Sequence, residues 1–237
     1  MTRTFLALLA SVTAACPDAH VKGEQRTPAA AQVPAPSAAD SLPTSASVFV
    51  GCGFLLVENH GTTNFTVLLR ADDARQASQE SGSLWVLDGV AVETQVADAA
   101  TMGAPQARGD QLLHRHREWE TGYTAETNGW TGLRTTAPRM IDLNGGMRAM
   151  TWSYDTPTPL RVLGFEVTRV LYVTTAVDDL VFVMSAPLRP DDDAERVLRT
   201  IHRSLATLRS SDRPTDVYAL SAQVQGGPRP WAGCPRD

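Results

Sequence analysis

The segment EVTRVLYVTTAVDDLVFVMSAPLRPDDDAERVLRTIHRSLATLR, residues 166–209, decides the fold that we expect for this chain. It begins with two runs rich in β-branched residues, 166–175 and 180–186, which are apolar at both odd and even positions. A strand that is apolar on both faces is covered on both faces. Because Asp178 and Asp179 are typical turn residues, the two runs predict an antiparallel hairpin in the middle of a sheet.

One amphipathic helix is expected after the hairpin. Aspartates at its start suit the positive end of the helix dipole, and we expect Asp191 or Asp192 to be the N-cap. At about 100° per residue, the apolar side chains of this stretch fall within one arc of the helix. They are Ala194, Val197, Leu198, Ile201, Leu205 and Leu208. Burial of this stripe contributes on the order of 10 kcal/mol before entropy, so the helix is predicted to dock on the body.

The rest of the body consists of shorter strand-like runs and one further helix. Residues 105–123 favour a helix with Leu112, Leu113, His116, Trp119 and Tyr123 on one face. Strands are expected over residues 47–60, 64–69, 83–92, 93–97, 133–136, 139–143 and 147–154. A meander of strands with one helix in the middle and one at the end predicts an α+β fold, in which helices cover both faces of an antiparallel sheet.

The first 16 residues, MTRTFLALLASVTAAC, have the features of a secretory signal. A cation at Arg3 precedes an apolar stretch and small residues, and the stretch is too short to span a bilayer as a mature helix. The end of this segment resembles the lipobox of bacterial lipoproteins, with Thr13 where the family usually has Leu. The resemblance implies cleavage before Cys16 and its acylation. Ordinary secretion, with a cut near Ala15, is the alternative.

Composition divides the chain into four parts. Residues 1–15 are the expected signal peptide, and residues 16–46, rich in Ala, Pro and Ser without aromatics, are an expected disordered tether. Residues 47–209 form the expected α+β domain, and residues 210–237 an expected C-terminal tail. The tether could hold the body away from a membrane surface, or it could be a neutral spacer.

The chain contains three cysteines: Cys16, Cys52 and Cys234. If Cys16 is acylated, two remain in an oxidising compartment, where a disulfide between Cys52 and Cys234 is expected. Closing a loop of this length constrains the unfolded chain by about 4–5 kcal/mol. Two unpaired thiols are the alternative.

A family resemblance supports the predicted fold. The runs GMRAMTWSYDTP, residues 146–157, and TRVLYVTTAVDDLVFVMSAPLRPDDDAERVLRTIHRSLATLR, residues 168–209, resemble the C-terminal half of the PsbP-like superfamily, which includes DcrB-type bacterial lipoproteins. The resemblance is a pattern without a signature motif. The N-terminal half departs from it, because the family's opening strand with a following Pro and Trp is missing. The resemblance implies an α/β/α sandwich that binds partners.

Few residues are candidates for chemistry. The cluster His114, His116 and Glu120 could recruit a metal, but residues two apart on a helix point away from each other. We therefore interpret His116 as packed and His114 as solvated, and we expect no metal site and no catalytic residue. No Ser elbow, phosphate loop or dinucleotide fingerprint occurs in the sequence.

The tryptophans give the remaining functional indication. Trp119 and Trp130 border a Gly- and Thr-rich segment and are candidates for a binding surface, with core packing as the alternative. The net charge of −5, without a Lys/Arg run, argues against a nucleic-acid partner. We expect a lipid-anchored protein of the bacterial cell envelope that binds an envelope protein without a cofactor. The alternative is a secreted metal-binding protein or metal-dependent enzyme that uses His114 and His116.

Overall fold

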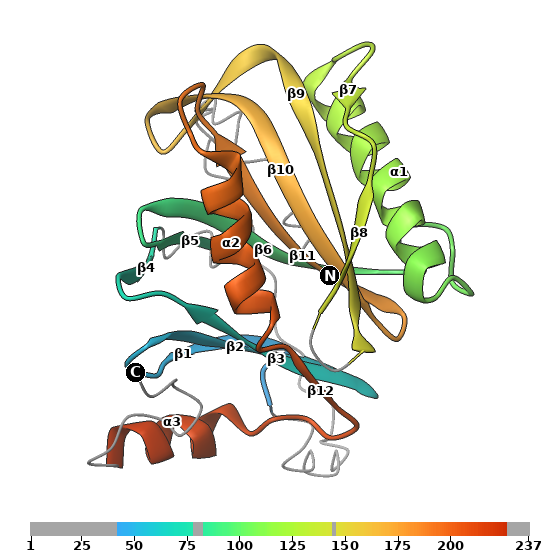
Figure 1. Cartoon of the computed structure of the whole chain (residues 1–237). Coiled ribbons are helices and arrows are strands. Elements are labelled where there is room, and N and C mark those ends of the chain that lie inside the picture. The colour runs from blue at the N-terminus through green and yellow to red at the C-terminus, as the bar shows by residue number, and fades with distance from the viewer. Residues whose placement is uncertain (1–41, 78–82, 144–145, 227–237) are drawn as a thin grey trace, which may run out of the picture. The chain divides into compact units, whose positions relative to one another are not determined.

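The computed structural model describes residues 42–77, 83–143 and 146–226. The chain divides between Ser41 and Leu42, so all described residues belong to the second unit. This part contains twelve strands and three helices (Figure 1). They are β1 (Ser45–Phe49), β2 (Gly53–His60), β3 (Thr63–Arg70), β4 (Ala74–Gln76), β5 (Leu84–Leu87), β6 (Val90–Asp98), α1 (Gly109–Asn128), β7 (Arg134–Thr135), β8 (Arg139–Asp142), β9 (Arg148–Val162), β10 (Phe165–Val177), β11 (Leu180–Leu188), α2 (Ala194–Leu205), β12 (Arg209–Ser211) and α3 (Val217–Gly226).

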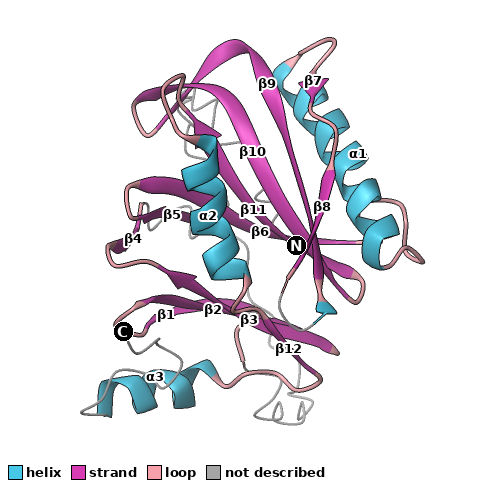
Figure 2. Ribbon diagram, viewed as in Figure 1, coloured by secondary structure: helices cyan, strands magenta, loops and turns pink. Residues whose placement is uncertain are grey.

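The strands form two antiparallel sheets (Figure 2). The larger has the order β4-β5-β6-β11-β10-β9-β7, with β8 also paired to β9, and the smaller has the order β1-β2-β3-β12. The α+β class with antiparallel pairing is thus confirmed, but the expectation of a single sheet is wrong. The hairpin β2–β3 is apolar on both faces, and Leu55 and Leu68 form their own small cluster, against which Leu220 and Val224 of α3 pack. Such a hairpin requires cover on both sides.

The predicted central hairpin is present. Strands β10 and β11 pair from Arg169↔Leu188 to Val177↔Leu180, and Asp178 takes the first turn position with a positive φ of 52°. The flanking strands are β9 beside β10 and β6 beside β11, so the hairpin lies inside the larger sheet. This position explains why both runs are apolar at odd and even positions.

Successive side chains of β10 belong to two different cores. Leu171 and Val173 pack in one cluster with Val197, Ile201 and Leu205 of α2. Val170 and Tyr172 belong to a second cluster with Leu112 and Leu113 of α1. Since neighbouring residues of a strand point to opposite faces, the two helices contact oppositely directed side chains of the same strand. The first cluster also includes residues of β2 and β3, so α2 joins the two sheets.

The N-cap of α2 is neither of the two predicted residues, Asp191 and Asp192, but the next one. Asp193 is the N-cap and accepts a hydrogen bond from the Glu195 N–H at 3.0 Å. Asp192 instead forms an ion pair with Arg189, with the Nη2–Oδ1 distance at 2.7 Å. The predicted stripe is mainly correct, because Val197, Ile201, Leu205 and Leu208 are buried and Ala194 and Leu198 are half-buried. Thr200 and Ser204 are also buried, which the apolar pattern did not indicate.

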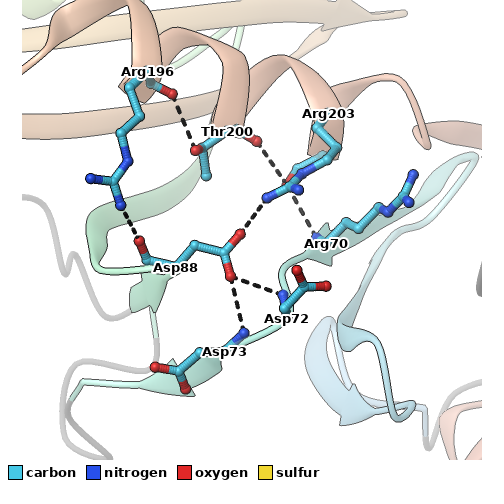
Figure 3. Close-up of polar contacts among 8 residues, drawn as sticks. Arg70, Asp72, Asp73, Asp88, Arg196, Thr200 and Arg203 are labelled. Atoms are coloured by element: carbon cyan, nitrogen blue, oxygen red, sulfur yellow. Dashed lines mark hydrogen bonds and ion pairs between the residues drawn. The ribbon is translucent and has the colours of Figure 1, made fainter.

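The turn between β5 and β6 holds α2 through Asp88 (Figure 3). One carboxylate oxygen accepts hydrogen bonds from the backbone N–H groups of Asp72 and Asp73 at 2.9 and 3.0 Å, and the other binds Arg203 of α2. The Asp88 carbonyl accepts a bond from Arg196 at 2.6 Å. Burial alone would raise the pKa of Asp88, but these donors outweigh burial and lower the pKa below its usual value.

Replacement of Asp88 by Ala is expected to lower the free energy of unfolding by about 2 kcal/mol at pH 7, because three donors lose a charged acceptor. Asp88→Asn, which keeps the side chain's tolerance of a positive φ, is expected to lose less. A carboxyl with a lowered folded pKa stabilises above its unfolded pKa of about 3.9, and this contribution is lost as pH falls through the folded value. Urea unfolding of both variants at pH 7 measures this difference, and equal stability of all three proteins would contradict it.

Strand β9 is longer than predicted. We expected it to end at Tyr154, before the prolines, but it continues to Val162 and pairs with the start of β10. The pairing shifts at this point, where Asp155 and Leu160 lie opposite Arg169 and Val167. Pro157 and Pro159 therefore occupy a bulge, where no ladder donor is required.

Both ends of the described fold extend beyond the predicted domain of residues 47–209. Strand β1 begins at Ser45, and the predicted tail supplies two of the three residues of β12 and all of α3. Strand β12 pairs with β3, and Val217 of α3 is buried. No helix within the described ranges is both long and apolar enough to cross a membrane.

Candidate functional site

Helix α1 presents one buried face and one open face, and the candidate site lies around it. The helix ends at Gly129, whose positive φ of 64° allows the Trp130 N–H to bond to the Ala125 carbonyl at 2.8 Å. The buried residues are Leu112, Leu113, His116, Glu120 and Thr124. The predicted helix is confirmed, but its buried face is shifted toward Glu120 and Thr124 and away from Trp119 and Tyr123, which are half-buried.

Glu120 is the centre of a buried polar cluster beneath the helix. Its side chain is only 3% exposed, and its Oε1 accepts hydrogen bonds from the Tyr172 hydroxyl at 3.0 Å and from the Thr124 hydroxyl at 3.2 Å. Burial raises the pKa of the Glu120 carboxyl, and the two hydrogen bonds oppose this rise only in part. The cluster thus holds a carboxyl group whose charged form is disfavoured.

A stack of aromatic rings supports the cluster from the sheet. The rings of Trp152 and Tyr172 lie parallel, with centroids 4.3 Å apart and an interplanar angle of 7°. Tyr154 lies beside both, and burial raises its pKa to about 12. Burial also raises the pKa of Tyr172 well above its usual value, so both hydroxyls remain protonated and can donate.

Glu93 of β6 is the second carboxyl group near α1. It is half-buried, and burial raises its pKa to about 7. A hydrogen bond with the Gln95 side chain lowers the pKa, and the charge of Glu120 raises it. With a pKa of about 7, Glu93 can hold and release a proton near neutral pH, which is a property often found at functional sites.

The structure does not bring the predicted metal candidates together. His114 is exposed, whereas His116 is buried with 1% of its surface accessible. Burial lowers the pKa of His116 to about 4, so its ring is neutral at pH 7. Its Nδ1 has no hydrogen-bond partner among the described residues. Within these residues there is no group of three His, Cys, Asp or Glu side chains suited to a metal ion.

A groove follows the open face of α1. Its volume is about 360 Å³, and it is lined by Arg115, Glu118, Trp119, Gly122, Tyr123 and Glu126. The Trp119 and Tyr123 rings are stacked at 5.4 Å with an interplanar angle of 10°. Arg115 forms an ion pair with Glu118 at 3.2 Å, so the second carboxylate of the groove, Glu126, gives it an excess of negative charge.

Trp130, the second predicted surface residue, lies outside this groove. Its ring meets Tyr154 edge to face at a centroid distance of 6.4 Å, and it packs against the same core as α1. Of the cysteines, Cys52 is half-buried in the turn between β1 and β2, whereas Cys16 and Cys234 lie outside the described residues. The pairing of Cys52 with Cys234 therefore remains a prediction, as does acylation of Cys16.

Sequence reasoning missed Glu93, Glu120, Tyr154 and Tyr172 as members of one cluster. The sequence contained a weak indication of the cluster. Glu120 is four residues after His116, so the two side chains lie on the same face of the predicted helix. The two tyrosines are eighteen residues apart on strands that proved to be neighbours, and only the register places them together. The sequence indicated Glu120 only as a possible metal ligand beside His114 and His116, because a glutamate is rarely buried unless it is paired.

No family model matches the chain, and no curated protein matches it. Among solved structures, the chain is similar to the solution structure of cyanobacterial PsbP (CyanoP) from Synechocystis sp. PCC 6803, with a TM-score of 0.37 and 10% sequence identity. The match covers 75% of this chain and 99% of that chain. At this distance the similarity assigns no function.

Proposed function

We propose that this protein is a lipid-anchored, non-enzymatic binding module of the bacterial cell envelope, with a PsbP-like α/β/α body and a protein partner. Acylation of Cys16 would make the segment between Cys16 and β1 a tether to the membrane, and a Cys52–Cys234 disulfide would fix the C-terminal tail. The groove on α1 is the partner-binding surface. The observation that supports it most is the glycine within that groove.

Gly122 lies inside α1, where glycine is unfavourable. Glycine within a helix costs about 1 kcal/mol relative to Ala. The local backbone does not require it, because a Cβ at this position would meet nothing within 4 Å and its φ is not positive. The absence of a side chain leaves space beside the stacked rings of Trp119 and Tyr123. A residue that weakens the helix and opens the groove supports a role in binding.

The chemistry of the groove favours a partner that inserts a basic side chain. A Lys or Arg side chain over an aromatic face gains about 0.5–2 kcal/mol from the cation–π interaction. Glu126 adds a carboxylate that no described residue pairs with in an ion pair, and the open space beside Gly122 admits the aliphatic stem. An envelope protein with an exposed Arg or Lys beside apolar residues fits this site.

Substitution of Gly122 separates stability from binding. Gly122→Ala is expected to raise the free energy of unfolding by about 1 kcal/mol, because helix propensity improves and no clash arises. Gly122→Trp fills the groove, and envelope proteins that co-purify with the wild type are expected to be lost. Gln111→Trp, an exposed position on α1 outside the groove, is the matched control and should retain them. Equal recovery with Gly122→Trp would contradict the assignment.

The anchor is tested separately by labelling cells with a palmitate analogue. The wild type should incorporate the label and the Cys16→Ala variant should not. Absence of label in the wild type would contradict the lipid anchor, and would leave the groove experiment unaffected.

A further inference from the structure

A second cavity, separate from the α1 groove, lies where the β9–β10 and β5–β6 turns meet the start of α2. Its volume is about 310 Å³. It is lined by residues of both turns, the ends of β4, β5 and β11, and the first part of α2. Those that matter here are Arg75, Leu163, Phe165, Arg189 and Arg196. The cavity shares no lining residue with the groove.

The charges of the cavity favour an anion. It contains three guanidinium groups and two carboxylates, Asp192 and Asp193. Both carboxylates are engaged: Asp192 accepts two bonds from the Arg189 guanidinium at 2.7 and 3.1 Å, and Asp193 caps α2. The remaining positive charge is not neutralised by the lining residues.

Two of the arginines have N–H groups that form no hydrogen bond with another described residue. Arg196 uses Nη2 to bind the Asp88 carbonyl, and its other N–H groups form no hydrogen bond within the described ranges. Arg75 is exposed on the edge strand β4, and its side chain forms no hydrogen bond or ion pair with another described residue. A guanidinium group presents paired N–H donors that match the oxygens of a phosphate or carboxylate.

Part of the cavity lining is apolar and includes a residue that is unfavourable at its position. Leu163 and Gly164 form the two-residue turn between β9 and β10, with φ values of 50° and 84°. Such turns prefer Asn, Asp or Gly, and Asp88–Gly89 satisfies this preference in the neighbouring hairpin. Leu163 is also 48% exposed, so it contributes little to the core. Neither the turn nor the core explains a leucine here, whereas an apolar ligand would.

Phe165 extends this apolar wall toward the charged side. The Arg189 guanidinium lies over its ring, 5.6 Å from the centroid. Pro187 of β11 also lines the cavity. Apolar and cationic surfaces are therefore continuous within one cavity.

We propose that this cavity binds a single-chain anionic amphiphile. Arg75 and Arg196 hold its phosphate or carboxylate, and its hydrocarbon chain lies along Leu163, Phe165 and Pro187. This site does not depend on the proposed function of the α1 groove.

Calorimetric titration of the full-length chain with dodecyl phosphate, below its micelle concentration, tests the proposal. Inorganic phosphate and the uncharged dodecyl maltoside are the two comparison ligands. Dodecyl phosphate is expected to bind with a dissociation constant at least about tenfold lower than that of inorganic phosphate or dodecyl maltoside. Only dodecyl phosphate contacts both the arginines and the apolar residues of the cavity. Equal affinity for inorganic phosphate would reduce the cavity to a simple anion site and contradict the proposal, as would equal affinity for the maltoside.

Two substitutions test the cationic and the apolar parts of the cavity lining separately. Arg75→Gln should weaken dodecyl phosphate binding about tenfold. Arg139 is an exposed arginine on β8, which pairs with β9 near the opposite edge of the sheet from β4, and Arg139→Gln should leave binding unchanged. Leu163→Asn should raise the midpoint of thermal unfolding, because Asn suits the turn, and should also weaken dodecyl phosphate binding without affecting inorganic phosphate. Wild-type affinity of Arg75→Gln or of Leu163→Asn for dodecyl phosphate would overturn the proposal.

Discussion

Replacing Ile201 with Ala is expected to lower the free energy of unfolding by about 2–5 kcal/mol. Ile201 is 0% exposed and packs in the core that α2 shares with β10, β11 and the smaller sheet. Truncation removes apolar contacts and leaves a cavity in this closely packed core. Equilibrium unfolding in urea, followed by circular dichroism, measures the loss.

Arg199→Ala is the control for this substitution. Arg199 is exposed on the same helix, and its replacement should change stability by less than about 0.5 kcal/mol. If Ile201→Ala were as mild as Arg199→Ala, α2 would not be docked on the central hairpin as described.

Replacing Glu93 with Gln is expected to raise the free energy of unfolding by about 3 kcal/mol at pH 8, with little change at pH 4. The pKa of Glu93 rises from its usual 4.5 to about 7 on folding, so the folded state retains a proton that the unfolded state releases. Stability therefore falls as pH rises from about 4.5 to about 7, and a tenfold change in proton affinity corresponds to about 1.4 kcal/mol. Gln removes the charged form and with it this loss.

Urea unfolding of the wild type and Glu93→Gln across this pH range measures the effect. Glu166→Gln, an exposed carboxylate on β10, is the control and should behave like the wild type. A difference between Glu93→Gln and the wild type that does not grow with pH would show that Glu93 is ionised in the fold without cost.

The pKa shift of His116 changes the free energy of unfolding in the opposite direction over the same pH range. Its folded pKa is lowered to about 4, so the unfolded state takes up a proton first, and stability falls as pH drops from about 6.5 to about 4. The Glu93 and His116 contributions therefore oppose each other in the wild type. Once Glu93 is replaced by Gln, the His116 contribution should appear as a loss of stability on acidification.

The sequence was informative where one kind of interaction dominated. The β-branched runs of β10 and β11 and the turn at Asp178 predicted the central hairpin, and the stripe around Ile201 predicted the docked helix, because apolar burial determines both. The helix over 105–123 was also predicted, although its extent and its buried face were shifted.

The candidate site was less predictable, because its residues oppose the usual preferences of their positions. Glu120 is a charged residue on a buried face, Gly122 is a glycine inside a helix, and Leu163 is an apolar residue with a positive φ in an exposed turn. From a sequence pattern alone, such a glutamate is expected to be solvated, such a glycine to break the helix and such a leucine to lie in an unremarkable loop. Only the three-dimensional arrangement shows that Gly122 and Leu163 line cavities and that Glu120 bonds to Tyr172.

Photo-crosslinking in the native cell envelope tests the binding role of α1 most directly. A photoreactive phenylalanine analogue would replace Glu118, an exposed residue that lines the groove, in one variant and the exposed Gln111 of the same helix in another. We expect irradiation to give a discrete protein adduct from position 118 that is absent from position 111 and is lost when Gly122 is also changed to Trp. Adducts of equal yield at both positions, or none at position 118, would contradict the groove as the partner-binding surface.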